Sequence, residues 1–233
     1  MADQPARVAV ILIGYYRTGK GTIAKKFKAQ GCPVWDTGRE LAALAEKNPQ
    51  DARLDPVRKG TLVACETVMR FLRLWIIALM QQNPAHKIAV FDGIFRKDTQ
   101  LEVIQFLRER GYRVIVIHLT TPPEVCDARP PRPGRIEDVD PTIIANRQES
   151  WEKNTVPVFG QLASHGISLA RGNLIEIVNR DQSEEQTYQL VYEFVEQHRA
   201  VLVPLHKRLA QPAVPIFMTT SPSKVPEECL STR

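Results

Sequence analysis

The sequence predicts an α/β fold in which a five-stranded parallel sheet carries helices on both faces. The first observation is that short apolar runs alternate with longer amphipathic segments along the 233 residues. The second is that these runs are continuously apolar, as in strands buried on both faces, which are typical of parallel sheets. The third is the stretch GYYRTGKGT at residues 14–22, a glycine-containing loop placed directly after the first apolar run.

The five predicted strands are short apolar runs bounded by glycine, proline or polar residues. They cover residues 8–13, 32–35, 87–93, 112–119 and 174–178. The third run is apolar until Asp92, near its C-terminal end.

The helices between the strands are predicted from apolar residues at three- and four-residue spacing and from their end signals. Gly31 ends the first helix, Asn48-Pro49 stops the second, and Ser183 with the glutamates after it opens the last. Pro157 should bend or restart the helix that contains it. The predicted helices cover residues 21–30, 37–47, 61–82, 98–111, 121–129, 141–166 and 183–200.

The remaining segments are predicted to lack regular structure. Residues 51–60 are polar and loop-like, and residues 130–141 hold four prolines and a glycine. Residues 201–233 lose the helical periodicity and are rich in proline and serine, so we expect a flexible C-terminal tail after a domain of residues 1–200.

The composition is that of an ordinary globular protein, with 43% hydrophobic and 24% charged residues. The net charge of +5 suits anionic ligands such as phosphates, and it also suits weak binding of nucleic acid. The four cysteines form no close pair and no metal-ligand spacing, which favours reduced thiols. The N-terminus resembles neither a secretory signal nor a transit peptide, and the apolar stretch FLRLWIIALM is too short to span a bilayer. We therefore expect a cytoplasmic protein.

The stretch at 14–22 fits the phosphate-loop pattern G-x-x-x-x-G-K. Between Gly14 and Thr22, backbone amides and the positive end of the following helix can face phosphate oxygens. Lys20 would then reach the outer phosphates, and Thr22, or a water it holds, would meet Mg²⁺. The alternative is an ordinary turn between a strand and a helix.

A carboxylate and a set of arginines complete the candidate chemistry. Asp92, at the tip of a buried strand, could hold Mg²⁺ through water, or it could cap a helix or begin a turn with Gly93. Arginine offers flat, forked donors that stabilise the negative charge of a transferring phosphoryl group, although most arginines are simply solvated. The arginines in question are Arg96, Arg129, Arg132, Arg135 and Arg147.

Six stretches, taken in order, carry a resemblance to a known family. They are GYYRTGKGT, DTG, KGTLVACE, FDGIFRKDTQ, ARPPRPGRIED and NRQESWEKNTVPV. Their order and spacing resemble the adenylate kinase family of nucleoside monophosphate kinases in its short-lid form, from residue 8 to about 198. The resemblance implies a P-loop kinase fold with a small helical acceptor-binding insertion at about 38–66 and a lid at about 129–140.

The resemblance also implies roles for individual residues. The donor phosphates would lie on Gly14, Gly19, Lys20, Gly21 and Thr22, and Mg²⁺ would be held by Thr22 and Asp92, through water. The residues implied to bind the acceptor monophosphate are Thr37, Gly38, Arg39, Leu62, Val63, Gly93, Arg96 and Gln100. The catalytic cations would be Lys20, Arg96, Arg129, Arg135 and Arg147, and Glu137 with Asp138 would order the lid.

Several positions depart from the family's pattern. Tyr16 and Arg17 stand at proline-like and glycine-like places of the loop. A positive φ at Arg17 would cost on the order of 1 kcal/mol, and its guanidinium could contact phosphate or lie idle in solvent. Ala42 replaces an acceptor-phosphate arginine for which Arg39 could substitute, and Val125 replaces the arginine that stacks on the donor base.

The sequence therefore predicts an enzyme that transfers a phosphoryl group from ATP, with Mg²⁺, to a nucleoside monophosphate. AMP is favoured because Gln100 matches the glutamine that reads an adenine edge. The alternatives are a UMP/CMP-type or other small-acceptor kinase, and a nucleotide-binding regulator of the same fold with little turnover. We expect small nucleotides as partners, with neither nucleic acid nor membrane. The sequence does not indicate an oligomeric state.

Overall fold

The centre of the protein is a parallel sheet with strand order β2-β3-β1-β4-β5. The computed structural model describes residues 7–59, 61, 63–131, 138–179 and 182–200. All four neighbouring strand pairs are parallel, which confirms the predicted α/β class and the five-stranded parallel sheet. The fold is consistent with a P-loop kinase-like fold. The strands are β1 (Arg7–Gly14), β2 (Val34–Asp36), β3 (Ile88–Asp92), β4 (Tyr112–Thr120) and β5 (Leu174–Val178).

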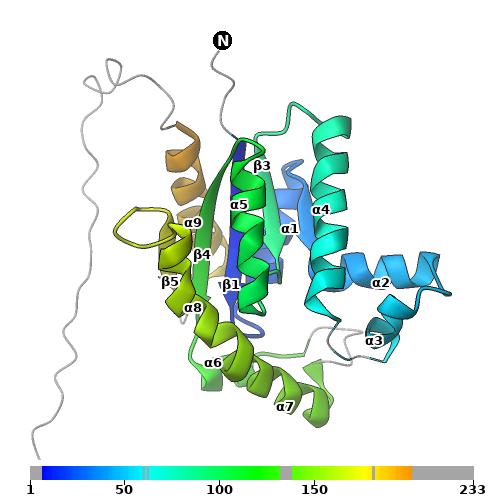
Figure 1. The fold of residues 1–233 in the computed structure, drawn as a ribbon. Coiled ribbons are helices and arrows are strands. Elements are labelled where there is room, and N and C mark those ends of the chain that lie inside the picture. The colour runs from blue at the N-terminus through cyan, green and yellow to red at the C-terminus, as the bar shows by residue number, and fades with distance from the viewer. Residues whose placement is uncertain (1–6, 60, 62, 132–137, 180–181, 201–233) are drawn as a thin grey trace, which may run out of the picture. The chain divides into compact units, whose positions relative to one another are not determined.

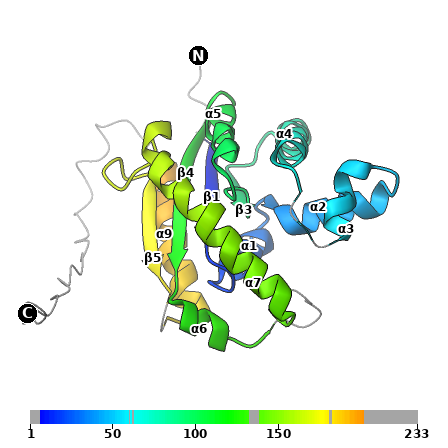
Figure 2. The same ribbon diagram turned by 60° about the horizontal axis from the view of Figure 1, so that its bottom comes forward.

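Helices cover both faces of this sheet, as Figures 1 and 2 show. On one face lie α4 (Cys65–Gln82), α5 (Glu102–Arg108) and α8 (Val156–Leu162). On the other face lie α1 (Lys20–Ala29) and α9 (Glu184–Ala200). The remaining α-helices of the described residues are α2 (Thr37–Lys47), α3 (Asp55–Arg58), α6 (Pro123–Ala128) and α7 (Pro141–Ser150). Within the described ranges, no helix combines the length and the apolarity needed to cross a membrane.

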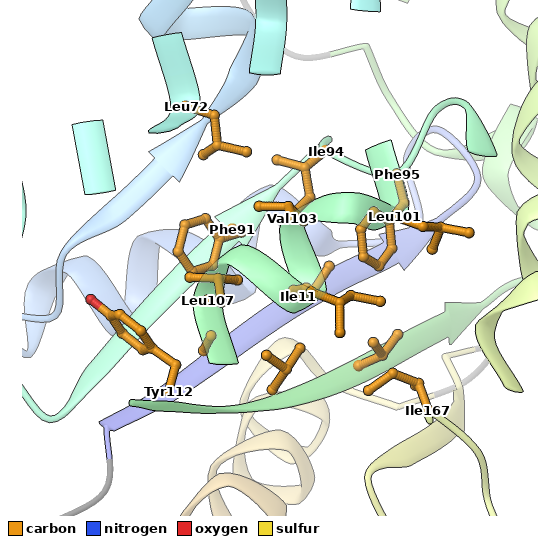
Figure 3. Packing of buried hydrophobic residues seen from close by; sticks show 14 of the residues in the cluster. Ile11, Leu72, Phe91, Ile94, Phe95, Leu101, Val103, Leu107, Tyr112 and Ile167 are labelled. Carbon is orange, nitrogen blue, oxygen red and sulfur yellow. The ribbon is translucent and has the colours of Figure 1, made fainter. Parts of the chain in front are cut away.

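The continuous apolar run of β1 serves two cores at once. Successive side chains of a strand point to opposite faces, so Ile11 joins the cluster under α4 and α5, while Leu12 joins the cluster under α1 and α9. Figure 3 shows the first cluster, where Ile11 lies among residues such as Leu72 and Phe91. A strand with one face exposed to solvent would have polar residues at alternate positions. The continuous apolar run therefore predicted burial on both faces.

A third, smaller cluster holds α2 and α3 against the start of α4. It contains Leu41, Ala45, Leu54 and Val68. The prediction of a loop over residues 51–60 was wrong here, because Ala52–Leu54 form a 3₁₀ turn and Asp55–Arg58 form α3. The carboxylate of Asp51 accepts a hydrogen bond from the Arg53 amide, and Leu54 is fully buried. One buried leucine in a polar segment was too weak a pattern to reveal these turns.

Two of the observed α-helices begin four residues later than predicted. The helix expected from residue 61 begins at Cys65, after Ala64 in an extended conformation. The helix expected from residue 98 begins with a 3₁₀ turn at Asp98–Leu101 and becomes α-helical only at Glu102.

Pro157 restarts its helix, as predicted. The chain passes from α7 into a π-helical turn at Trp151–Thr155, and α8 then begins with Pro157 in its first turn. Proline lacks the N–H that would continue the hydrogen-bond ladder, so a change of helical type at this point is expected.

The α4 helix offers a matched pair for testing the core. Leu72 is fully buried, whereas Leu74, two residues away, is 53% exposed. We expect Leu72→Ala to lower the free energy of unfolding by about 2–5 kcal/mol, because it removes buried methyl groups and leaves a cavity. Leu74→Ala should change it by about 0.5 kcal/mol or less. Urea unfolding followed by circular dichroism measures both, and equal effects would contradict the assigned face of α4.

Candidate active site

The residues singled out from the sequence lie mainly at the carboxyl edge of the sheet. Because every strand runs in the same direction, the segments that follow β1, β2 and β3 leave the sheet at one edge. The strand β3 lies directly between β1 and β2. The glycine loop therefore neighbours the segment after β3, at the edge where ligands bind in open α/β sheets.

The glycine loop is closely packed against β4. A Cβ atom added to Gly14 would lie 2.4 Å from the carbonyl oxygen of Leu119, so only glycine fits there. Gly19 has φ 100° and stands directly before α1, where its carbonyl accepts hydrogen bonds from the amides of Thr22 and Ile23. The loop thus delivers the chain into the first turn of a helix whose free amides favour an anion.

Lys20 folds back over this loop. Its ammonium group lies 2.7 Å from the Gly14 carbonyl oxygen, 2.5 Å from the Tyr15 carbonyl oxygen and 3.2 Å from the Thr18 hydroxyl. The side chain therefore holds its charge against the loop's own backbone, next to the amides that the phosphate-loop pattern assigns to phosphate.

Arg17 has a positive φ of 57°, the only such residue other than glycine among those described. The positive φ considered from the sequence is present at this residue, and the guanidinium is bound to backbone carbonyl oxygens and is not idle in solvent. The group donates hydrogen bonds to the carbonyl oxygens of Asp127 and Arg129 at 3.2 and 3.0 Å, and to that of Asp138. Charge-assisted bonds of this kind contribute about 1.5–3 kcal/mol each, which offsets the backbone cost.

The two tyrosines before Arg17 also connect the glycine loop to the segments that follow β4. The hydroxyl of Tyr16 donates a hydrogen bond to the Asp127 carboxylate. The Tyr15 ring packs on Tyr16 and meets Trp151 edge-on, with ring centroids 4.4 and 5.7 Å apart. Burial raises the pKa of Tyr15 and of Tyr16, so both phenols stay protonated. The two tyrosines pack the loop against the segments that follow β4.

Asn179, directly after β5, is a site residue that the sequence analysis missed. Its amide nitrogen donates to the Thr18 carbonyl oxygen at 2.8 Å, and its amide oxygen accepts from the Thr187 hydroxyl at 3.1 Å. Its backbone carbonyl accepts from Thr121 and from Arg129, at 2.9 and 3.1 Å. The Asn179 side chain thus ties the loop to α9, and its backbone carbonyl ties the same residue to the segments that follow β4.

The segments expected to bind the acceptor meet where β2 and β3 end. The Thr37 hydroxyl donates to the Asp92 carbonyl oxygen at 3.0 Å. Gly93 has φ +77°, and a Cβ placed on it would lie 3.6 Å from a guanidinium nitrogen of Arg96 and 3.6 Å from Thr37. Arg96, Gly93 and Thr37 are therefore brought together as the resemblance implied, and Gly38 follows in the first turn of α2.

Two other acceptor-side residues are engaged within the protein. Gln100 is 4% exposed, and its side-chain oxygen accepts from the Arg96 amide at 2.6 Å. Arg39 pairs with the Asp36 carboxylate at 3.4 Å. Val63 is half-buried against the small α2–α3 cluster.

The predicted catalytic arginines are only partly described. Arg129 donates to the carbonyl oxygens of Arg17 and Asn179. Arg147 lies 3.6 Å from the carboxylate of Asp138, which is 2% exposed. Arg135, Leu62 and Glu137, with Gly60 and Arg132, lie outside the described residues.

The proposed metal residues have the chemistry that Mg²⁺ prefers, a hydroxyl and a carboxylate oxygen. Thr22 is half-buried in the first turn of α1, and Asp92 is half-buried at the end of β3, beside β1. Among the described residues no cluster of three histidine, cysteine or acidic side chains could hold a metal by itself. This pair fits an ion held mainly by waters and phosphate oxygens.

His118 contributes a half-buried imidazole near the loop. On β4 it stands beside Ile13 of β1, and its Nδ1 lies 3.1 Å from the Glu176 carboxylate. Burial lowers its pKa, while Glu176 acts in the opposite direction. Its ring centroid is 4.3 Å from that of Phe159, so its contacts are those of a packed residue.

Comparison with known proteins gives one informative similarity. No protein-family model matches the chain. The chain is 29% identical over 133 residues to UPF0200 protein PH1008 of Pyrococcus horikoshii, a match that covers 55% of this chain and 69% of that protein. That name states no activity. The fold and the loop are consistent with a nucleotide-binding P-loop protein, and the comparison does not identify an adenylate kinase.

The role of Asn179 can be tested by an isosteric change. Asn179→Asp replaces the donor to Thr18 with an acceptor and places a carboxylate against a carbonyl oxygen. We expect the free energy of unfolding to fall by about 1–3 kcal/mol, with faster hydrogen exchange in residues 14–20. Asn173→Asp is a matched control at the start of β5, where the side-chain oxygen accepts from Ser168 and the nitrogen donates to Gly166. Two outcomes would refute the role of Asn179 in holding the loop. One is unchanged hydrogen exchange in the loop of Asn179→Asp, and the other is an equally large acceleration in Asn173→Asp.

Proposed function

We propose that the protein is a nucleoside monophosphate kinase that transfers the γ-phosphoryl group of ATP to AMP. The observation that carries the proposal is that two groups of residues, to which we assign phosphate binding, lie next to each other at one edge of the sheet. The loop with Lys20 follows β1, and the group of Thr37, Gly93 and Arg96 follows β2 and β3. A donor and an acceptor phosphate bound at these two places would be neighbours, as direct transfer requires.

Catalysis would rest on position and charge. The transferring phosphoryl group spreads negative charge over its oxygens, and fixed cations stabilise that charge. Of the proposed catalytic cations, Lys20, Arg96, Arg129 and Arg147 lie among the described residues. No side-chain nucleophile is needed, because the acceptor phosphate itself attacks.

Mg²⁺ fits the oxygen ligands of Thr22 and Asp92. When bound with ATP it would neutralise charge on the donor phosphates. The protein's own part is to hold the two nucleotides in line and to keep water from the phosphoryl group, which would otherwise be hydrolysed.

AMP is the acceptor we place first, and Gln100 is the reason. In the structure its side-chain oxygen accepts from the Arg96 amide, so its amide nitrogen is the group that would donate to a base. A UMP/CMP-type or other small-acceptor kinase is the alternative among enzymes. Rates with AMP, GMP, CMP and UMP distinguish these acceptors.

A nucleotide-binding regulator with little turnover is the second candidate. Ala42 offers no charge at a place where the family carries an arginine, and the possible substitute Arg39 is paired with Asp36. Both features weaken the grip on an acceptor phosphate. This candidate requires tight ATP binding without ADP formation for any monophosphate.

Two substitutions test the kinase proposal. We expect Lys20→Ala and Arg96→Ala each to lower kcat/KM by at least about 10²-fold, because each removes a cation that faces phosphate. A coupled assay for ADP formation with ATP, Mg²⁺ and each monophosphate measures the effect. Lys25→Ala on α1 and Arg70→Ala on α4 are exposed controls that remove the same charges.

The controls should keep rates within about two-fold of the unchanged protein. Full activity in Lys20→Ala or Arg96→Ala would contradict the assigned roles. Absence of turnover with all four monophosphates, while ATP still binds, would favour the regulator.

A further inference from the structure

We propose that Arg17 is a positioning residue for phosphoryl transfer, which orients Arg129 and Arg147 and does not itself bind phosphate. The proposal rests on the proposed function, since it assigns a role within that reaction. It concerns the position where this chain departs most clearly from the usual filling of a phosphate loop.

The first step is the reach of the Arg17 guanidinium. It donates to Asp127 and Arg129 at the end of α6, and also to Asp138, shortly before α7. These acceptors are 110, 112 and 121 residues away in sequence. A planar fork with several fixed donors can bridge three carbonyl oxygens, whereas a lysine head has no such geometry.

The second step is that Arg129 in turn donates hydrogen bonds to the glycine loop. Its guanidinium donates to the Arg17 carbonyl oxygen and, at 3.1 Å, to that of Asn179. The left-handed conformation of Arg17 sets the direction of that carbonyl. Arg129 is therefore held by the backbone of the glycine loop, so its place depends on the loop's shape at residue 17.

The third step leads to Arg147. The backbone of Asp138 accepts from Arg17, and its buried carboxylate lies 3.6 Å from Arg147. A buried carboxylate depends on its cationic neighbour, so fixing the Asp138 backbone also fixes the direction of the Arg147 interaction. Arg17 thus links both described lid-region arginines to the glycine loop.

The remaining donors of Arg17 argue against direct phosphate binding. Both terminal nitrogens already donate to carbonyl oxygens. The Nε atom is buried and meets no hydrogen-bond partner among the described residues. Turning both terminal nitrogens toward a phosphate would break three hydrogen bonds that connect the loop to both segments.

The experiment compares Arg17→Gly, which suits the positive φ, with Arg17→Lys, which keeps the charge. We expect both to lower kcat by about 10- to 100-fold, because misplacement of catalytic groups by about 1 Å is costly. The KM for ATP should change by less than about three-fold, since the backbone amides of the loop remain. An Arg17→Lys protein with nearly full kcat, or a large rise of KM with kcat unchanged, would overturn the proposal.

Combining substitutions separates a positioning role of Arg17 from a direct contact between Arg17 and the phosphates. In a protein that already carries Arg129→Ala and Arg147→Ala, we expect Arg17→Gly to reduce the remaining kcat by less than about three-fold. A further loss as large as in the unchanged protein would show that Arg17 acts independently. Arg171→Gly, at an exposed arginine of the turn before β5, controls for the loss of a charge.

Hydrogen exchange gives a readout that needs no turnover. Residues 126–131 and 138–147 should exchange faster in Arg17→Gly than in the unchanged protein or Arg171→Gly, with α5 unaffected as an internal reference. Unchanged exchange there would overturn the positioning role. An unchanged protein that transfers no phosphoryl group would overturn the proposed function instead, and exchange would still decide whether Arg17 holds these segments.

Discussion

The close packing of the glycine loop against the ends of β4 and β5 constrains every other part of the candidate site. Gly14 lies so close to the Leu119 carbonyl that a single added carbon would clash, and Asn179 holds Thr18 from the other side. With its backbone fixed in this way, the loop can carry Lys20 folded over it and Arg17 in a left-handed conformation. The segments after β4 are in turn tied to the loop.

Local patterns in the sequence were enough to predict the parallel sheet and to locate the glycine loop. The continuous apolar run of β1 indicates burial on both faces, and Gly14, Gly19 and Lys20 mark the turn into α1. The glycine-like place of Arg17 in the motif raised the question of a positive φ, and the structure has that φ. In each case, the information lies within about ten residues, the range over which strand and helix patterns act.

Contacts between distant residues could not be predicted in the same way. Asn179 and Thr18 are 161 residues apart, and the carbonyl partners of Arg17 are more than 100 residues away. The engagement of Gln100 by the Arg96 amide depends on a 3₁₀ turn that replaced the expected helical start. The short turns at residues 52–58 bury Leu54 completely, and tertiary burial of this kind overrides a polar local pattern.

The central claim is that two nucleotide phosphates meet at this edge of the sheet and exchange a phosphoryl group directly. Phosphorus NMR of the unchanged protein with ATP, Mg²⁺ and AMP tests it, because every phosphorus product is seen at once. The account predicts that ATP and AMP disappear in equal amounts while ADP grows as two molecules for each ATP consumed, without inorganic phosphate. Release of inorganic phosphate with AMP unchanged, or no change in any signal, would contradict it.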